Sequence, residues 1–167
     1  MKGVLRHIAN RWLHIFARRM PGSTTLRPLL HRWRGVQVGR NVFIGDEVYV
    51  ENEFPECVEI QDDVQISIRA ILIAHTRGSG KLIIEQGAFI GPNSVLVCGA
   101  GRTLRIGRGA VVGAGSVITK SVPAHLFVAP IAPKAMATVG VPLPLANSME
   151  EFLAGLKPLK RDKVDDQ

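Results

Sequence analysis

The sequence predicts an all-β fold, a single-stranded parallel β-helix of about four triangular coils. Three observations predict it: aliphatic residues recur at every sixth position, interruptions of this repeat fall at one phase, and small residues lie at a fixed offset. We expect residues 1–35 to form an N-terminal basic amphipathic helix and linker, 36–123 the β-helix, and 124–167 a proline-rich strap, a short helix and a tail.

The aliphatic repeat comprises four trios of residues, and the step within each trio is six. These residues, termed anchors below, are Val38, Ile44, Val50, Ile60, Ile66, Leu72, Ile84, Ile90, Leu96, Ile106, Val112 and Ile118. Between trios the step grows to 10 or 12 residues, so the extra residues enter at the same point of every cycle. Each hexad therefore predicts one short strand and one corner, and three hexads predict one coil with the anchors pointing inward.

Small and β-branched residues lie four positions after most anchors, where they would fill the space that the anchors leave. They are Val42, Val48, Val64, Ala70, Ala88, Ser94, Ala110, Ser116 and Val122. Glycine often follows the anchor directly, and it suits a corner that needs positive φ or a close approach of two backbones. The alternative is a β-sandwich with short valine-rich strands, but twelve anchors in one register favour the β-helix.

Composition and charge narrow the classes of function. The chain has 167 residues, a net charge of +7 and only 5% aromatic residues. Between Lys2 and Arg40 there are nine Arg or Lys residues and no acid. Nucleic-acid binding is disfavoured because neither an aromatic stacking platform nor a recognition-helix motif is present. Cys57 and Cys98 lack CxxC spacing, which predicts reduced thiols in a cytoplasmic protein, and no metal site is expected.

The stretch from Gly3 to Met20 predicts an amphipathic helix. Its apolar stripe consists of Leu5, Ile8, Trp12, Ile15 and Phe16, with arginines on much of the other side. Two uses of this helix are open. It either caps the first coil, as repeat folds require, or lies on an anionic membrane surface through residues 3–20, at the inner face of the membrane.

The segment after the repeat changes character. Five prolines between residues 123 and 144 predict an extended strap. Ser148 and Glu151 have the spacing of a capping box, which predicts a short helix before the tail.

Candidate functional residues lie in the three insertions of the repeat, 51–59, 73–83 and 97–105, which we expect to cluster along one edge. His75 in the second insertion is the only histidine within the coils. A neutral imidazole suits a general base near pH 7, although a lone histidine in a loop is more often simply solvated.

Two segments carry a resemblance to a known family. The run from Gly113 to Pro123 closely resembles the closing coil of the hexapeptide-repeat acyltransferases, which include maltose, galactoside, serine and polysaccharide O-acetyltransferases. The segment Phe89-Ile90-Gly91-Pro92 resembles that family's aromatic-Ile-Gly segment, and His75 falls where the family keeps its histidine. The resemblance covers roughly residues 36–134.

The resemblance implies a left-handed β-helix that assembles as a homotrimer, with active sites between neighbouring prisms. It also implies acetyl transfer from acetyl-CoA, without a metal, and with His75 as the general base. CoA would pass the small residues Pro92, Gly113 and Ala114. Thr119, Lys120 and Lys134 would lie near its nucleotide end. Two departures are Pro130-Ile131-Ala132-Pro133-Lys134 in place of Gly-x-Pro-Ala-Lys, and Phe89 where tryptophan is common.

The acceptor is expected to be a hydroxyl of a carbohydrate or of a lipid-linked sugar, and less so an amine. Glu51, Asn52 and Glu53 are the candidate substrate-binding residues, and a carboxylate among them could orient the imidazole. The alternative is that these acids only keep the loop soluble. Two rival classes of protein are a zinc carbonic anhydrase and a non-catalytic scaffold or binding module. A zinc carbonic anhydrase needs three converging histidines, which the coils lack, whereas a non-catalytic scaffold or binding module stays open.

Overall fold

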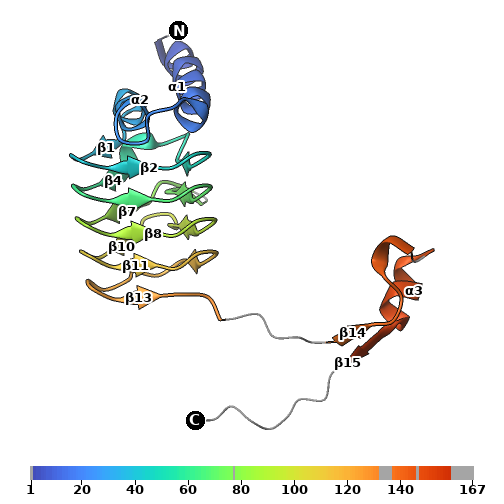
Figure 1. Cartoon of the computed structure of the whole chain (residues 1–167). Helices are drawn as coiled ribbons and strands as arrows, with labels where there is room; N and C mark the ends of the chain where they lie inside the picture. Colours follow the sequence, from blue (N-terminus) through green and yellow to red (C-terminus); the bar gives the residue numbers. More distant parts are fainter. Residues whose placement is uncertain (1, 77, 132–136, 146, 159–167) are drawn as a thin grey trace. The chain divides into compact units, whose positions relative to one another are not determined.

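The repeat region forms a parallel β-solenoid, as the sequence predicts (Figure 1). The computed structural model describes residues 2–76, 78–131, 137–145 and 147–158. The chain divides into two compact units, one that ends at Pro130 and one that begins at Ile131.

Thirteen short strands build three parallel sheets along the solenoid. They are β1 (Gln37–Val38), β2 (Phe43–Ile44), β3 (Tyr49–Val50), β4 (Val58–Ile60), β5 (Gln65–Ile66), β6 (Ile71–Ile73), β7 (Lys81–Ile84), β8 (Phe89–Ile90), β9 (Val95–Val97), β10 (Thr103–Ile106), β11 (Val111–Val112), β12 (Val117–Ile118) and β13 (Phe127–Val128). Sheet A has the order β1-β4-β7-β10, sheet B β13-β11-β8-β5-β2, and sheet C β12-β9-β6-β3. The first four coils each take one strand from each sheet, and β13 adds a fifth strand to sheet B.

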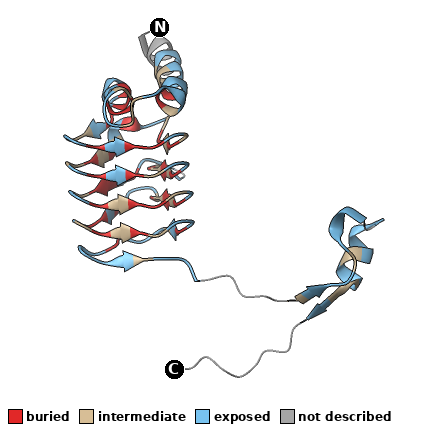
Figure 2. Cartoon of the chain, in the orientation of Figure 1, coloured by how far each residue is buried: buried red, intermediate tan, exposed pale blue. Residues whose placement is uncertain are grey.

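The anchors form the core of the solenoid (Figure 2). All are buried except Val38 and Ile118, which are partly buried in the first and last coils and pack against the same core. The small residues four positions later are all buried as well. Because a fully buried aliphatic side chain contributes about 1.5–3 kcal/mol, this stack of anchors supplies the main stabilisation of the prism.

The corners use two different backbone solutions. Positive φ occurs three residues after the anchor, for example at Asn41, Asp63 and Asn93. The glycines directly after the anchors have a different role: a Cβ at Gly91 would lie 2.6 Å from the backbone nitrogen of Ala114 in the next coil. Close approach of two coils therefore explains the glycine that follows an anchor.

Two helices cover the open side of the first coil, α1 (Lys2–Arg19) and α2 (Leu26–Arg34). The sequence predicted the first, but α2 falls where we expected a linker. Gly35 ends α2 in the left-handed conformation, with φ 104°. The helix escapes detection by apolar periodicity because its buried face carries Arg27, His31 and Arg34 beside Pro28 and Leu30.

Three arginines of α2 bind the outward-facing carbonyls of the first coil, one on each side of the triangle. Arg32 Nε donates to Val38 O at 2.9 Å, Arg27 Nη1 to Ile44 O at 3.0 Å and Arg34 Nη2 to Val50 O at 3.2 Å. The three acceptors are the three anchors of this coil. The guanidinium groups thus satisfy backbone acceptors that no preceding strand can pair.

Helix α1 turns an unexpected side toward the protein. His14 and Ala17 are buried, whereas Ile8, Trp12 and Phe16 of the apolar stripe are exposed. Helix α1 therefore packs through a narrow mixed face and leaves Ile8, Trp12, Ile15 and Phe16 of the apolar stripe exposed.

The solenoid continues past residue 123, the end expected from the six-residue spacing. Ile106 forms a parallel bridge with Val122, and β13 pairs with β11. Because the step from Ile118 to Val122 is shorter than six residues, the six-residue spacing does not predict this continuation.

The second unit contains an antiparallel pair, β14 (Ala137–Val139) with β15 (Leu156–Pro158), a 3-10 turn at Leu143–Leu145 and α3 (Met149–Ala154). The Ser148 hydroxyl accepts a hydrogen bond from the Glu151 backbone N–H at the start of α3. Residues 132–136 of the expected strap and the tail from Lys160 to Gln167 lie outside the described residues.

The buried histidines of the cap predict a pH-dependent stability. Burial, reinforced by neighbouring Arg34, lowers the pKa of both His14 and His31 to about 3. Below about pH 6.5 the unfolded chain binds protons that the folded chain does not. The free energy of unfolding therefore decreases as the pH is lowered, by up to about 1.4 kcal/mol per pH unit for each histidine.

The measurement is urea unfolding between pH 7.5 and 5, in the wild type and in His14→Leu. We expect the variant to lose roughly half of the pH slope. An unchanged slope would show that His14 does not remain neutral in the folded protein.

Candidate active site

The three insertions lie along one edge of the solenoid, where the chain passes from sheet C to sheet A. The first includes a 3-10 turn, Pro55–Cys57. The Thr76 hydroxyl of the second donates to Cys98 O of the third at 3.4 Å, and the Gly101 N–H donates to Ser79 O at 3.0 Å. The clustering that the in-phase insertions predicted is therefore present.

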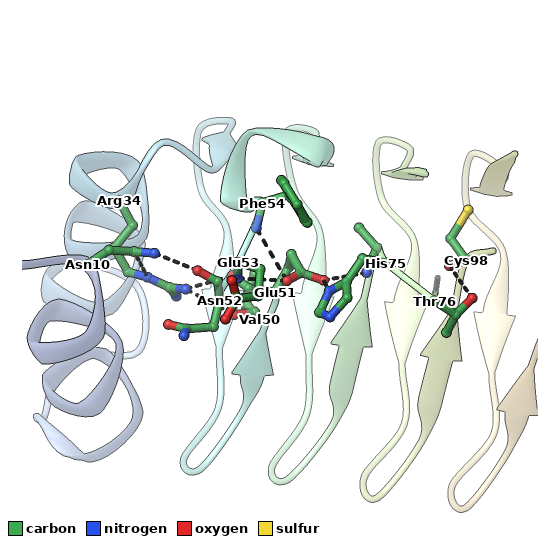
Figure 3. A network of polar contacts seen from close by, with 11 residues as sticks. Asn10, Arg34, Val50, Glu51, Asn52, Glu53, Phe54, His75, Thr76 and Cys98 are labelled. Atoms are coloured by element: carbon green, nitrogen blue, oxygen red, sulfur yellow. Dashed lines mark hydrogen bonds and ion pairs between the residues drawn. The ribbon is translucent and has the colours of Figure 1, made fainter. Parts of the chain in front are cut away.

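His75 stands at the base of the second insertion. Its Nδ1 lies 2.6 Å from Glu51 Oε2, and the edge of its ring contacts Phe54, with centroids 5.8 Å apart (Figure 3). A bridge between His75 and Ser79, together with the Gly80 N–H to Ala74 O bond of 2.7 Å, closes the loop tightly behind the ring. With Nδ1–H donated to a carboxylate, Nε2 carries the lone pair of the neutral imidazole.

Glu51 is buried, and its carboxylate accepts four hydrogen bonds from the protein. Oε2 accepts from His75 Nδ1 and from the Ala74 N–H at 2.8 Å, and Oε1 from the N–H groups of Glu53 and Phe54. Burial by itself would raise the pKa of the Glu51 carboxyl, but the bonds from His75, Ala74 and Glu53 outweigh it and lower the pKa. A carboxylate held in this way orients the imidazole.

A groove of about 890 Å³ lies beside the histidine on the outer face of sheet C. Its residues are Arg18, Glu47, Tyr49, Arg69, Ile71, Ile73, His75 and Thr76. The strands supply an apolar floor, and Arg18 brings a charge from α1. The groove is an open surface with an oriented imidazole at one end, an arrangement suited to removing a proton from a bound molecule.

The remaining predicted residues lie at two edges of sheet C. Pro92, Gly113 and Ala114 occupy the corner from sheet B to sheet C, where the Gly115 N–H donates to Pro92 O at 2.9 Å. Thr119 and Lys120 follow β12 at the edge that carries His75, and both are exposed. These residues are not gathered into one cluster, since the width of sheet C separates the two groups. Lys134 lies outside the described residues.

The neighbours of Glu51 differ from it in exposure. Asn52 is partly buried and its carbonyl accepts a bond of 2.5 Å from Asn10 Nδ2, whereas Glu53 is exposed. Only Glu53 and part of Asn52 are thus available to a molecule in solution. Among the described residues, no three His, Cys, Asp or Glu are placed to share a metal ion.

Several residues around the site were missed from the sequence. Phe54 contacts the imidazole, Tyr49 lines the groove, and Arg34 binds the backbone at Glu51. Tyr49 had a detectable signal, because it precedes the anchor Val50 and so must point outward. Arg34 had none, since its helix was not expected.

Comparisons with known proteins place the repeat region. No family model matches the chain. Over 122 residues the chain is 33% identical to the bifunctional protein GlmU of Carboxydothermus hydrogenoformans. This match covers 65% of this chain and 26% of that protein. Over 42 residues it is 60% identical to the bifunctional protein GlmU of Thermotoga maritima. This match covers 25% of this chain and 8% of that protein.

A third relative has an activity in its name. Over 99 residues the chain is 29% identical to 2,3,4,5-tetrahydropyridine-2,6-dicarboxylate N-acetyltransferase of Staphylococcus aureus, which covers 58% of this chain and 38% of that protein. The chain thus has a hexapeptide repeat that folds as a β-solenoid, and over part of its length it is similar to these three relatives. This hexapeptide-repeat protein spans 38% or less of the length of each of these three relatives.

The pair of Glu51 and His75 predicts a stability effect in the hexapeptide-repeat protein. In Glu51→Gln, one oxygen is replaced by an NH2 group that must face two donors, so we expect a loss of about 1–3 kcal/mol in the free energy of unfolding. Glu53→Gln is the matched control, because the exposed side chain can change while its N–H still binds Glu51; its effect should stay within about 0.5 kcal/mol. Urea unfolding at pH 7.5 measures both, and equal stabilities would contradict the buried network.

Proposed function

We propose that this protein is an acetyl-CoA-dependent O-acetyltransferase that acts on a carbohydrate hydroxyl, with His75 as its general base. The observation that carries the proposal is the bond of 2.6 Å between His75 Nδ1 and the buried Glu51 carboxylate, at the end of an open groove. The relative named as an N-acetyltransferase supports transfer of an acetyl group.

In this mechanism, His75 Nε2 removes the proton from the acceptor hydroxyl as the oxygen attacks the thioester carbonyl. The new C–O bond gives a tetrahedral intermediate, which collapses as the C–S bond breaks. The departing CoA sulfur takes the proton from the imidazolium, which restores neutral His75. Glu51 stabilises the imidazolium between these two proton transfers. No covalent enzyme intermediate is required.

The proposed donor site uses both edges of sheet C. Pro92, Gly113 and Ala114 offer small side chains for the pantetheine arm, and Thr119 and Lys120 are assigned to the nucleotide end, together with Lys134. Because Pro92, Gly113 and Ala114 lie at the other edge of sheet C from His75, we propose a homotrimer in which neighbouring prisms form each site.

The proposed acceptor contacts come from the first insertion. Glu53 is exposed and Asn52 partly so, whereas the Glu51 carboxylate is already occupied by protein donors. Hydrogen bonds from sugar hydroxyls suit the Glu53 carboxylate, whereas Asn52 Oδ1 is buried. An amine acceptor differs only in the attacking atom, so an acceptor screen includes both amino and neutral sugars. A non-catalytic scaffold is the alternative.

The central prediction concerns His75→Asn. Loss of a general base should lower kcat about 10²–10⁴-fold, while acetyl-CoA binding is retained. His125→Asn is the matched control, since His125 is exposed at a corner with φ 58°, which asparagine tolerates. Calorimetric titration with acetyl-CoA and with dephospho-CoA measures binding, and release of free CoA thiol measures transfer.

The outcomes distinguish an acetyltransferase from a non-catalytic scaffold. Binding by both variants, weaker for dephospho-CoA, with activity lost only in His75→Asn, supports the proposal. Absence of binding at millimolar acetyl-CoA would favour the scaffold.

We also propose that the protein contacts the anionic inner face of the membrane through α1, where a lipid-linked sugar would be found. Trp12 is 58% exposed and Phe16 49%, and both belong to the stripe that faces away from the first coil. Arg11 and Arg19 on the same helix are exposed as well, and the first acid in the sequence is Asp46. Aromatic side chains beside arginines are typical of interfacial helices.

Within the described residues, no helix is both long and apolar enough to cross a membrane. The proposed contact is therefore of the kind in which an amphipathic helix lies in the interface.

The membrane contact predicts the behaviour of Trp12→Glu/Phe16→Glu. We expect at least a tenfold loss of binding to vesicles that contain phosphatidylglycerol, because the two aromatic side chains that would insert into the interface become charged. Leu145→Glu is the control, since this exposed side chain lies in the second unit. Co-sedimentation at low and high salt measures binding, and equal sedimentation of the double variant and wild type would refute the contact.

A further inference from the structure

We propose that Arg34 of the helical cap is a positioning residue for the Glu51–His75 pair. This inference rests on the proposed function, in which His75 is the base. It adds that the N-terminal cap is part of the catalytic apparatus, because one residue of α2 fixes the backbone from which the Glu51 carboxylate projects.

The contacts of Arg34 converge on that backbone (Figure 3). The side chain is buried, and Nη2 donates to Glu51 O at 2.6 Å and to Val50 O at 3.2 Å. Its own orientation is fixed by Nε, which donates to Asn10 Oδ1 at 2.8 Å, and by Nη1, which lies 3.0 Å from His31 Nδ1.

Asn10 of α1 strengthens the same connection. Its side-chain carbonyl accepts from Arg34, and its Nδ2 donates to Asn52 O at 2.5 Å. Three consecutive carbonyls, those of Val50, Glu51 and Asn52, are thus held by two side chains of the cap. The turn that carries Glu51 has its position set by both helices.

A displacement of this turn would be transmitted directly to the imidazole. Glu51 Oε2 is bonded both to His75 Nδ1 and to the Ala74 N–H, so the carboxylate sets the ring and the backbone next to it. A shift of about 1 Å in a catalytic group can cost about 100-fold in rate. Arg34 acts on the reaction only through Glu51, which makes it a positioning residue.

The other arginines of α2 provide an internal control. Arg27 is buried to nearly the same extent as Arg34, and it also donates to an anchor carbonyl of the first coil, that of Ile44. It additionally binds Met20 O and the carboxylate of Asp46. These contacts lie on a different side of the triangle from the histidine edge. Arg27→Met therefore removes an equivalent cap contact without touching the turn at Glu51.

The experiment compares Arg34→Met, Arg34→Lys and Arg27→Met in the full chain. The first readout is the ring Nδ1–H signal of His75 in proton NMR of ¹⁵N-labelled protein, assigned by its loss in His75→Asn. We expect the signal to shift or to exchange with water in Arg34→Met, to be partly restored in Arg34→Lys, and to be unchanged in Arg27→Met. The second readout is acetyl transfer, with a kcat at least tenfold lower in Arg34→Met and an unchanged KM for acetyl-CoA.

Equal NMR spectra and equal kcat for Arg34→Met and Arg27→Met would overturn the inference and leave Arg34 as a structural cap. If Arg34→Met does not fold, Arg34→Lys decides by the same two readouts. If the wild type transfers no acetyl group but its His75 signal still depends on Arg34, the proposed function fails while the coupling stands. The NMR readout thus separates the two failures.

Discussion

The hydrogen-bonding edge of the first coil is the constraint on which the rest of the structure depends. A stack of parallel strands has to begin somewhere, and its first strands have carbonyls with no preceding strand to pair them. In this protein the carbonyls of Val38, Ile44 and Val50 each bind one arginine of α2. Arginine side chains of a helix thus satisfy the carbonyls at the open edge of the solenoid. This use partly explains the basic character of the N-terminal segment.

This solution has an electrostatic cost, since guanidinium groups are withdrawn from water. Burial lowers the pKa of Arg34 to about 10, an effect that Tyr49 and Glu51 partly offset, and Arg34 remains charged at neutral pH. His14 and His31 stay neutral beside it for the same reason. Arg34 binds the backbone carbonyl of Glu51, whose carboxylate bonds to His75. The cap and the candidate site are consequently one polar network, built where an apolar core would otherwise be expected.

The β-solenoid could be predicted from the sequence because the six-residue period determines which side chains point into the core. Ile66, Leu72 and Ile90 had to be buried once the six-residue register was recognised, and their complete burial confirms it. His75 and Glu51 could be placed at one edge because both follow anchors of sheet C. A carboxylate partner for the imidazole was expected from the sequence, but its identity was not, since it depends on which of three neighbouring polar residues turns inward. The helix α2 was missed because its buried face is made of arginine and histidine, so the pattern of apolar residues carries no trace of it.

The insertions have a consequence for how such a protein can diversify. Val38 pairs with Ile60, 22 residues later, and Ile60 pairs with Ile84, 24 residues later, yet both pairs stack in the same sheet. The two additional residues are absorbed entirely at the corner that carries His75, and no anchor changes its direction. Loop length at this corner is therefore decoupled from strand register. A lineage of such proteins can exchange the loop at this corner for a longer or shorter one without repacking a single core side chain.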